Sequence, residues 1–290
     1  MSGKYELLGR RDLDAASRPL RLYADKRERG TALIVGGSSR FHGAPVLASL
    51  AALRTGAGYV KTFVPGAVVD PVRRLSPNII VAALGTRQIR FNREIKKEIA
   101  RSNAIAIGMG IGIESSALSC SRRIIDSSIG NKKTVVVDAD ALRALGDIGF
   151  SARNGSIIAT PHDGEFRMIT GARPSTDFSA RIKDAASLAA KKGIVVVLKG
   201  HKTIVTDGER TRVCRPSSAA LATMGSGDVL SGIICGYAAQ GATAFQAACA
   251  GVYLHAAIGD RLAKKMGVHV IAADLVDAIP LAIKEFDKSY

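Results

Sequence analysis

The sequence predicts an α/β fold with a central, mainly parallel sheet that carries helices on both faces. Short runs rich in Val and Ile alternate with longer helical segments, which is the order produced when a helix connects each parallel strand to the next. Hydrophobic residues make up 47% of the chain, but aromatic residues only 5%, and tryptophan is absent. The core must therefore be built from aliphatic side chains, as in sheets buried on both faces. The 290 residues fit one large domain, residues 1–290, and no repeat or linker divides them.

Seven strands are expected where an apolar, β-branched run ends at Gly, Pro or Asp. They cover residues 31–37, 59–65, 78–84, 104–110, 134–140, 156–161 and 194–200. Helices are predicted between them at residues 44–55, 91–101, 117–128 and 177–192. After the last strand, residues 202–215 are typical of a small antiparallel hairpin, with Asp207-Gly208 at its turn. Three apolar helices follow, near residues 227–240, 244–265 and 273–286.

The charge of the chain is strongly basic. Lysine and arginine total 41 against 25 acidic residues, a formal net charge of +16. This excess favours anionic partners, whether nucleic acid, an acidic membrane surface or phosphorylated small molecules. Arg93, Lys96, Lys97 and Arg101 have near-helical spacing and are expected on a solvated helix face. Dispersed charge and few aromatics argue against nucleic acid as a partner, so a basic nucleic-acid-binding protein is a distant alternative.

The cysteines and the first residues bear on location. Cys120, Cys214, Cys235 and Cys249 form no CxxC pair and show no metal-ligand spacing. Cys235 and Cys249 lie among small apolar residues and are expected to be buried, reduced thiols. The first residues lack the apolar core of a secretory signal, and the longest apolar stretches are interrupted by polar residues. We therefore expect a cytoplasmic protein without a membrane partner.

Polar residues follow the predicted strands where ligands bind in such sheets, beyond the carboxyl ends. They are residues 36–38, 108–112, Asp138 with Asp140, residues 160–165 and residues 199–203. We expect all of them to line one cleft. The pair Asp138 and Asp140 suggests a metal site, but capping of the next helix by Asp140 is the expected explanation for at least one of them.

The segment MGSGD, residues 224–228, enters a predicted helix. Its small residues let a ligand approach the backbone, and free amides at a helix start can hold an anion. A phosphoryl group in transfer spreads charge over its oxygens, which suits such a nest. Asp228 at its edge could take a proton from an attacking hydroxyl. Helix capping by Ser226 or Asp228 after a glycine turn explains the same residues equally well.

Two further motifs carry candidate ligand contacts. In TPHDGE, residues 160–165, His162 could bind a substrate, although a structural histidine is the commoner case. Glu165 could order Mg²⁺ through water, because that ion keeps much of its hydration shell. In LKGHKT, residues 198–203, Lys199, Lys202 and the hydroxyl of Thr203 could meet nucleotide phosphates.

The ordered set of motifs resembles the ADP- or ATP-dependent NAD(P)H-hydrate dehydratases of the ribokinase-like superfamily. The resemblance runs from about Gly36 to Ala250 through GGSSRFHGAPVLASLAALRTGAGYV, AIGMGIG, VVVDADAL, TPHDGE, VVLKGHKT and MGSGDVLSGI. It implies a ribokinase-like fold and a hydro-lyase that returns (6S)-NADHX and (6S)-NADPHX to NADH and NADPH. Phosphorylation of the ring hydroxyl would be followed by phosphate elimination. ADP or ATP is the implied phosphoryl donor, Mg²⁺ the metal and a homotetramer the assembly.

The resemblance also implies roles for individual residues. Asp228 is the implied catalytic base, which also contacts substrate. The remaining implied residues are an anion hole of Gly225, Ser226 and Gly227; substrate contacts from Ala44, Gly110 or Gly112, and His162; and a nucleotide segment of Lys199, Gly200, His201, Lys202 and Thr203, with Gly227 also near the nucleotide.

The chain departs from the family pattern at several positions. Asp163 stands where Pro is usual, and Met224 and Ser226 replace the commoner Gly and Thr. RPSSAALAT, residues 215–223, lacks the Asn- and Gly-rich segment often found before MGSGD. No epimerase domain precedes the dehydratase motifs, so any enzymatic epimerisation of the hydrates is expected from a separate protein.

The nearest alternative function is a ribokinase-like kinase of a small alcohol, such as a vitamin precursor or a sugar. It would use the same Asp228 and the same anion hole. His162 in TPHDGE and the GGSSRFHGA loop favour the dehydratase.

Overall fold

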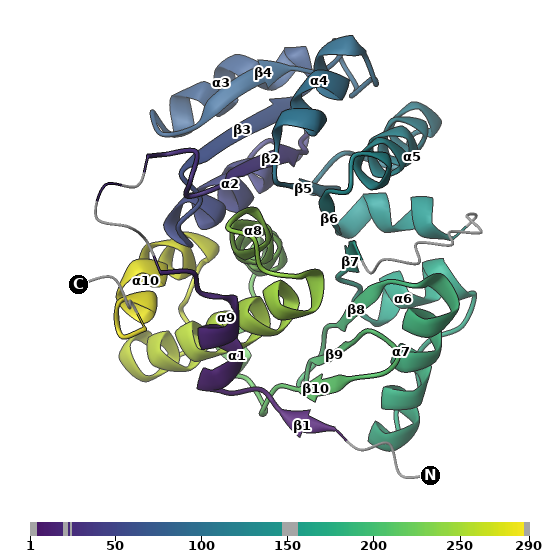
Figure 1. Cartoon of the computed structure of the whole chain (residues 1–290), viewed down its shortest axis with the longest axis vertical. Coiled ribbons are helices and arrows are strands. Elements are labelled where there is room, and N and C mark those ends of the chain that lie inside the picture. The colour runs from purple at the N-terminus through teal and green to yellow at the C-terminus, as the bar shows by residue number, and fades with distance from the viewer. Residues whose placement is uncertain (1–4, 20–22, 24, 147–155, 287–290) are drawn as a thin grey trace.

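One ten-stranded sheet runs through the residues that the computed structural model describes, which are 5–19, 23, 25–146 and 156–286 (Figure 1). Its order is β1-β10-β9-β8-β7-β6-β5-β2-β3-β4. The strands are β1 (Glu6–Leu7), β2 (Thr31–Val35), β3 (Tyr59–Val64), β4 (Ile80–Ala83), β5 (Ala104–Ile107), β6 (Thr134–Val137), β7 (Ile157–Ala159), β8 (Val195–Leu198), β9 (Ile204–Thr206) and β10 (Thr211–Val213).

The pairing of the strands confirms the predicted mainly parallel sheet. From β8 to β4, each strand pairs in parallel with its neighbour. Strands β9 and β10 form the predicted antiparallel hairpin, and β9 also pairs antiparallel with β8. The short strand β1, which the sequence analysis did not predict, joins β10 in parallel at the edge.

The predicted helices are present with small changes at their ends, and α1 and α3 are additional; α6 begins within TPHDGE at Asp163, two residues before the helix start expected at Glu165. The helices are α1 (Arg10–Ala16), α2 (Ala44–Arg54), α3 (Val69–Leu75), α4 (Arg93–Arg101), α5 (Ser115–Gly130), α6 (Asp163–Thr170), α7 (Phe178–Lys192), α8 (Ser226–Ala239), α9 (Ala244–Met266) and α10 (Ala272–Lys284). Short 3₁₀ helices cover η1 (Gly66–Val68), η2 (Ala139–Leu145) and η3 (Ala219–Leu221).

Both faces of the sheet are buried, because side chains alternate along each strand. In β2, Ala32 and Ile34 pack into a core with α1, α2, α8, α9 and α10. Leu33 and Val35 face the opposite way, into a core with α4, α5, α6, α7 and η2. Figure 1 shows the two helical layers on either side of the strands. This arrangement explains why the strands are continuous apolar runs rather than alternating ones.

The basic helix and the cysteines lie as predicted. The four basic residues expected on the solvated face of α4 are exposed, whereas Ile95 and Ile99 of the same helix are buried. All four cysteines are buried as free thiols. Among the described residues, no helix combines the length and the apolar character needed to cross a membrane.

Helix α8 lies close against α2, and glycine makes this approach possible. A Cβ atom at Gly232 would lie 2.3 Å from the backbone oxygen of Ala48, and one at Gly236 would lie 3.0 Å from that of Ala52. Most residues of α8 are buried. Because α8 is held this tightly, its first turn has a defined position at the carboxyl ends of the strands.

We expect Gly232→Ala to lower the free energy of unfolding by about 1–2 kcal/mol. Overpacking commonly costs roughly 1–3 kcal/mol, and contact with a backbone oxygen places Gly232 in the upper part of that range, above the gain of about 1 kcal/mol that Ala has over Gly within a helix. Denaturant titration measures the difference. The matched control is Gly130→Ala in α5, where a Cβ atom would meet nothing within 4 Å. That control should be neutral or stabilising, and equal losses in both variants would contradict the close-packing argument.

Candidate active site

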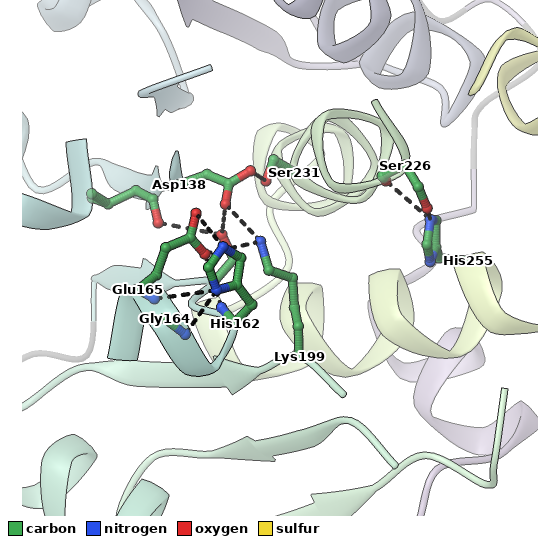
Figure 2. Close-up of polar contacts among 10 residues, drawn as sticks. Asp138, His162, Gly164, Glu165, Lys199, Ser226, Ser231 and His255 are labelled. Carbon is green, nitrogen blue, oxygen red and sulfur yellow. Dashed lines mark hydrogen bonds and ion pairs between the residues drawn. The ribbon is translucent and has the colours of Figure 1, made fainter. Parts of the chain in front are cut away.

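A buried carboxylate at the end of β6, Asp138, organises the polar groups at this edge of the sheet (Figure 2). It accepts hydrogen bonds from the hydroxyls of Thr160 and Ser231, both at 2.7 Å, and from Lys199 Nζ at 3.1 Å. Burial alone raises the pKa of such a carboxyl group. Here the Lys199 charge and the three donors outweigh burial and hold the pKa of Asp138 below its usual value. Asp138 is therefore an anion throughout the neutral pH range.

Lys199 is shared between two carboxylates. Its Nζ atom lies 3.1 Å from Asp138 Oδ1 and 3.4 Å from Glu165 Oε2. Burial lowers the pKa of a lysine, but these two negative charges outweigh it and raise the pKa of Lys199. A Cβ atom placed on Gly227 would lie 3.6 Å from this Nζ, so the ammonium is also beside the predicted anion hole.

The first turn of α6 gives His162 and Glu165 structural roles. His162 Nδ1 accepts from the amides of Gly164 and Glu165, at 3.0 and 3.2 Å, while Glu165 Oε2 accepts from the amide of His162 at 2.8 Å. This reciprocal pattern is a capping box. A neutral ring that accepts at Nδ1 carries its proton on Nε2. Its Nε2 lies 3.5 Å from Glu165 Oε1, and because the His162 side chain is 57% exposed, Nε2 is also accessible to a ligand.

Asp228 lies in the first turn of α8 with an unusual acidity. Burial and the nearby negative charges of Asp138 and Glu165 raise its pKa to about 7, although Lys199 opposes them. Near neutral pH this carboxyl group is therefore divided between its two protonation states. A base with such a pKa can accept a proton and release it again with little cost.

The start of α8 has no side-chain cap within the described ranges, and of its first amides only that of Ser226 has a backbone acceptor outside the helix, the Thr223 carbonyl oxygen at 3.3 Å. The N-cap residue is Gly225, with a left-handed φ of 87°, and no side chain caps the helix. The alternative in which Ser226 or Asp228 caps α8 is therefore wrong. The Ser226 hydroxyl instead contacts His255 Nε2 at 3.0 Å. Free amides in a helix first turn are suited to an anion.

Asp140 also departs from the prediction. The 3₁₀ helix η2 begins before it, at Ala139, and has no side-chain cap. The Asp140 carboxylate accepts a hydrogen bond from the amide of Gly112 at 2.9 Å. Asp140 therefore does not cap η2. Its side chain contacts the 108–112 loop and stabilises that loop.

A cavity of about 1210 Å³ opens beside the start of α8, where Ser226 and Gly227 line it. Its lining combines cationic groups with apolar side chains, as a site for a nucleotide requires. The lining includes the whole 199–203 segment, His162, Ser226 and Gly227, and most of residues 217–223. RPSSAALAT therefore contributes to the cavity wall although it lacks the Asn- and Gly-rich pattern.

The predicted single cleft is correct only in part. Ala44, Gly110, Gly112 and Asp228 do not line this cavity. A Cβ atom at Gly110 would lie 2.6 Å from Phe41 Cβ and 3.5 Å from Ala44 Cβ, so two of the predicted substrate residues do lie together. The cavity thus borders the start of α8 at Ser226 and Gly227, whereas Ala44 and Gly110 lie together outside the cavity.

Helix α7 holds the 199–203 segment through two side chains that sequence reasoning missed. Arg181 donates to the Lys199 carbonyl oxygen at 3.0 Å and to Asp163 Oδ1 at 2.5 Å. Lys202 Nζ lies 5.0 Å from the centre of the Phe178 ring. Asp163, which stands where the family usually has Pro, is therefore the ion-pair partner of Arg181. A cationic helix residue facing a strand end gives no periodic signal that would have revealed this contact.

The parallel sheet, the glycine-flanked helix start at residues 225–227 and the acidic residue in the first turn of α8 are those of a ribokinase-like fold. The chain superposes on a ribokinase-like superfamily protein from Enterococcus faecalis V583 with a TM-score of 0.83, at 22% identity, covering 98% of this chain and 97% of that one.

Sequence comparison narrows the class. A family model described as NAD(P)H-hydrate dehydratase matches residues 32–281, and the chain belongs to this family. It is 35% identical over 269 residues to an ADP-dependent (S)-NAD(P)H-hydrate dehydratase from Cenarchaeum symbiosum, covering 91% of each chain. It is 33% identical over 263 residues to a bifunctional NAD(P)H-hydrate repair enzyme from Pyrobaculum aerophilum. There it covers 90% of this chain but 52% of the relative, so the chain spans about half the length of that bifunctional enzyme.

A solved structure of another NAD(P)H-hydrate dehydratase has the same fold as this chain. The ADP/ATP-dependent NAD(P)H-hydrate dehydratase from Bacillus subtilis, co-crystallized with ATP/Mg²⁺, has a TM-score of 0.82 and 28% identity. The match covers 98% of this chain and 99% of the Bacillus chain.

We expect Asp138→Asn to lower the pKa of Asp228 from about 7. The substitution removes a negative charge that disfavours the Asp228 carboxylate and leaves the Lys199 charge less neutralised. Carboxyl ¹³C NMR titration measures this pKa directly. Asp126→Asn, an exposed position on α5, is the matched control and should leave it unchanged. An unchanged or higher pKa in Asp138→Asn would contradict the electrostatic argument.

Proposed function

We propose that this chain dehydrates (6S)-NADHX and (6S)-NADPHX to NADH and NADPH, with ADP or ATP as phosphoryl donor. The observation that carries the proposal is a half-buried Asp228 with a pKa near 7, set at the edge of an uncapped helix start. That helix start borders a cavity of nucleotide size. Family membership and the activity named for the Cenarchaeum relative support the same reaction.

In the proposed first step, Asp228 takes the proton of the ring hydroxyl, and the hydroxyl oxygen attacks the terminal phosphorus of the nucleotide. The bond from that phosphorus to the leaving nucleotide breaks, which yields AMP from ADP or ADP from ATP. The amides of Gly225 and Gly227, together with the Lys199 ammonium, would stabilise the charge on the transferring group, and the Ser226 amide would join them by exchanging its bond to the Thr223 carbonyl oxygen. Hydroxide is a poor leaving group from the ring, and the phosphate ester is a good one.

In the second step, the carbon–oxygen bond breaks and phosphate leaves with the electron pair. Loss of a proton from the neighbouring ring carbon restores the dihydropyridine. We propose that Ala44, Gly110 or Gly112, and exposed His162 Nε2 contact the hydrated dinucleotide. The 199–203 segment, held by α7, would receive the donor nucleotide.

Mg²⁺ is proposed to act with the donor nucleotide, where it would neutralise phosphate charge. No group of three or more His, Cys, Asp and Glu side chains suited to a metal occurs in the part of the chain that the structure describes. Glu165 already accepts from Lys199 and from the His162 amide. A water-mediated contact from Glu165 fits these partners, because it leaves both in place.

We propose a cytoplasmic location, which suits four cysteines that are all buried as free thiols. The homotetramer implied by the family resemblance stays a prediction, and sedimentation velocity measures the mass that decides it.

We expect a rise in absorbance at 340 nm when purified protein, Mg²⁺ and hydrated NADH are mixed with ADP or ATP. The donor that supports the rise identifies the nucleotide. Asp228→Asn should reduce turnover about 100-fold or more, because general-base catalysis contributes at least that factor. Calorimetry should show nucleotide binding largely intact in this variant. No rise with either donor, from folded protein supplied with both hydrate epimers, would instead favour the kinase of a small alcohol, and undiminished turnover in Asp228→Asn would refute the base assignment.

We also expect kcat/KM to rise with pH through about 7, since Asp228 must be deprotonated to act as base. Below that pH the rate should fall about tenfold per unit, as for a single essential carboxylate. A pH–rate profile in buffers of constant ionic strength measures this acidic limb, the range in which kcat/KM rises with pH. In Asp138→Asn the limb should move to lower pH, and a limb near pH 4 in the unmodified enzyme would contradict the role of the raised pKa.

A further inference from the structure

One buried titratable side chain next to the nest has no part in the proposed reaction. His255 lies on α9, is 9% exposed and lines the cavity beside Ser226 and Gly227. Its Nε2 atom is 3.0 Å from Ser226 Oγ and 3.1 Å from the Ser226 carbonyl oxygen (Figure 2). Both contacts go to one residue, the first of α8.

These contacts define the protonation state of the ring. A carbonyl oxygen can only accept, so the hydrogen bond to Ser226 O requires a proton on His255 Nε2. Burial lowers the pKa of His255 to about 4, with the Lys199 charge acting in the same direction, although the bond to Ser226 opposes them. The ring is therefore neutral at physiological pH, with its proton on Nε2 and none on Nδ1.

The geometry of the peptide bond links this contact to the nest. The Ser226 carbonyl and the Gly227 N–H belong to one planar trans peptide, so they point in opposite directions. Holding the carbonyl oxygen toward α9 aims the Gly227 N–H away from α9. That N–H is one of the proposed donors to the transferring phosphoryl group.

The sequence around Ser226 gives such a restraint something to act on. Gly225 and Gly227 flank it, and glycine restricts the backbone less than any other residue. Gly225 has φ of 87°, in the left-handed region. Ser226 is the one residue of this triplet with a side chain, and that side chain also contacts His255.

We propose that His255 is a positioning residue, whose neutral Nε2–H tautomer fixes the Ser226 peptide and so aims the Gly227 amide of the anion hole. This inference rests on the proposed function for its catalytic consequence, but not for the tautomer. His255 touches no reacting atom, and its effect passes through Ser226.

The proposal predicts a selective loss in turnover. His255→Leu fills the buried position with an apolar side chain but removes the donor, and it should lower kcat roughly 10- to 100-fold, approaching the loss seen when an oxyanion-hole donor is removed outright. The Kd for ADP, measured by calorimetry, should change much less than kcat. His255→Gln, whose side-chain amide can donate from a similar position, should restore most of kcat. The matched control is Cys249→Ala, a buried change elsewhere on α9, which should lower the melting temperature without lowering kcat.

Two outcomes of the kinetics would overturn the proposal: unchanged kcat in His255→Leu, or equal losses in the Leu and Gln variants, which would indicate packing alone. A second measurement uses the unmodified protein and so does not depend on whether a variant folds. ¹⁵N NMR of the unmodified protein should show His255 as the neutral Nε2–H tautomer from pH 6 to 8, and an Nδ1–H tautomer or a charged ring would refute the inference. Failure of the unmodified enzyme to produce NADH would count against the proposed function alone, since the tautomer is measured independently of activity.

Discussion

The ammonium of Lys199, held between Asp138 and Glu165, is the interaction on which the site depends. Buried charges are costly unless they are paired and hydrogen-bonded. Here the pairing joins the end of β6, the end of β8 and the first turn of α6. Ser231 extends it to α8 through its bond to Asp138. Because every partner comes from a different element, satisfying the charges also sets how those elements meet at the carboxyl edge of the sheet.

The same network sets the acidity of the proposed base. Two carboxylates share one ammonium, so the cluster carries a surplus of one negative charge in front of Asp228. Burial and that surplus raise the pKa of Asp228, whereas the Lys199 charge and the hydrogen bonds from Thr160, Ser231 and Lys199 lower that of Asp138. Two carboxyl groups of the same type thus take different roles through their surroundings. One remains an anion and anchors the lysine, and the other is poised to exchange a proton near neutral pH.

Much of this could be predicted from the sequence because it depends on local patterns. The runs that form β2 to β8 are apolar and β-branched, and Asp207-Gly208 marks the hairpin turn between β9 and β10. Strand β1 and helix α1 escaped prediction because both are short, and tertiary packing supports them: β1 pairs with β10, and α1 packs on α9. The capping roles suggested for Ser226 and Asp140 were wrong because each side chain has a tertiary partner, His255 and the Gly112 amide.

By itself the sequence determined the fold class, the order of the strands along the chain and the set of motifs that identifies the family. It also indicated which polar residues follow each strand, since a strand ends where its apolar run ends. Only the tertiary structure decided which of those residues meet. Asp138 and Lys199 are 61 positions apart, Ser231 and Asp138 are 93, and Ser226 and His255 are 29. Such pairs depend on sheet order and on helix packing, neither of which leaves a periodic trace in the sequence around either partner.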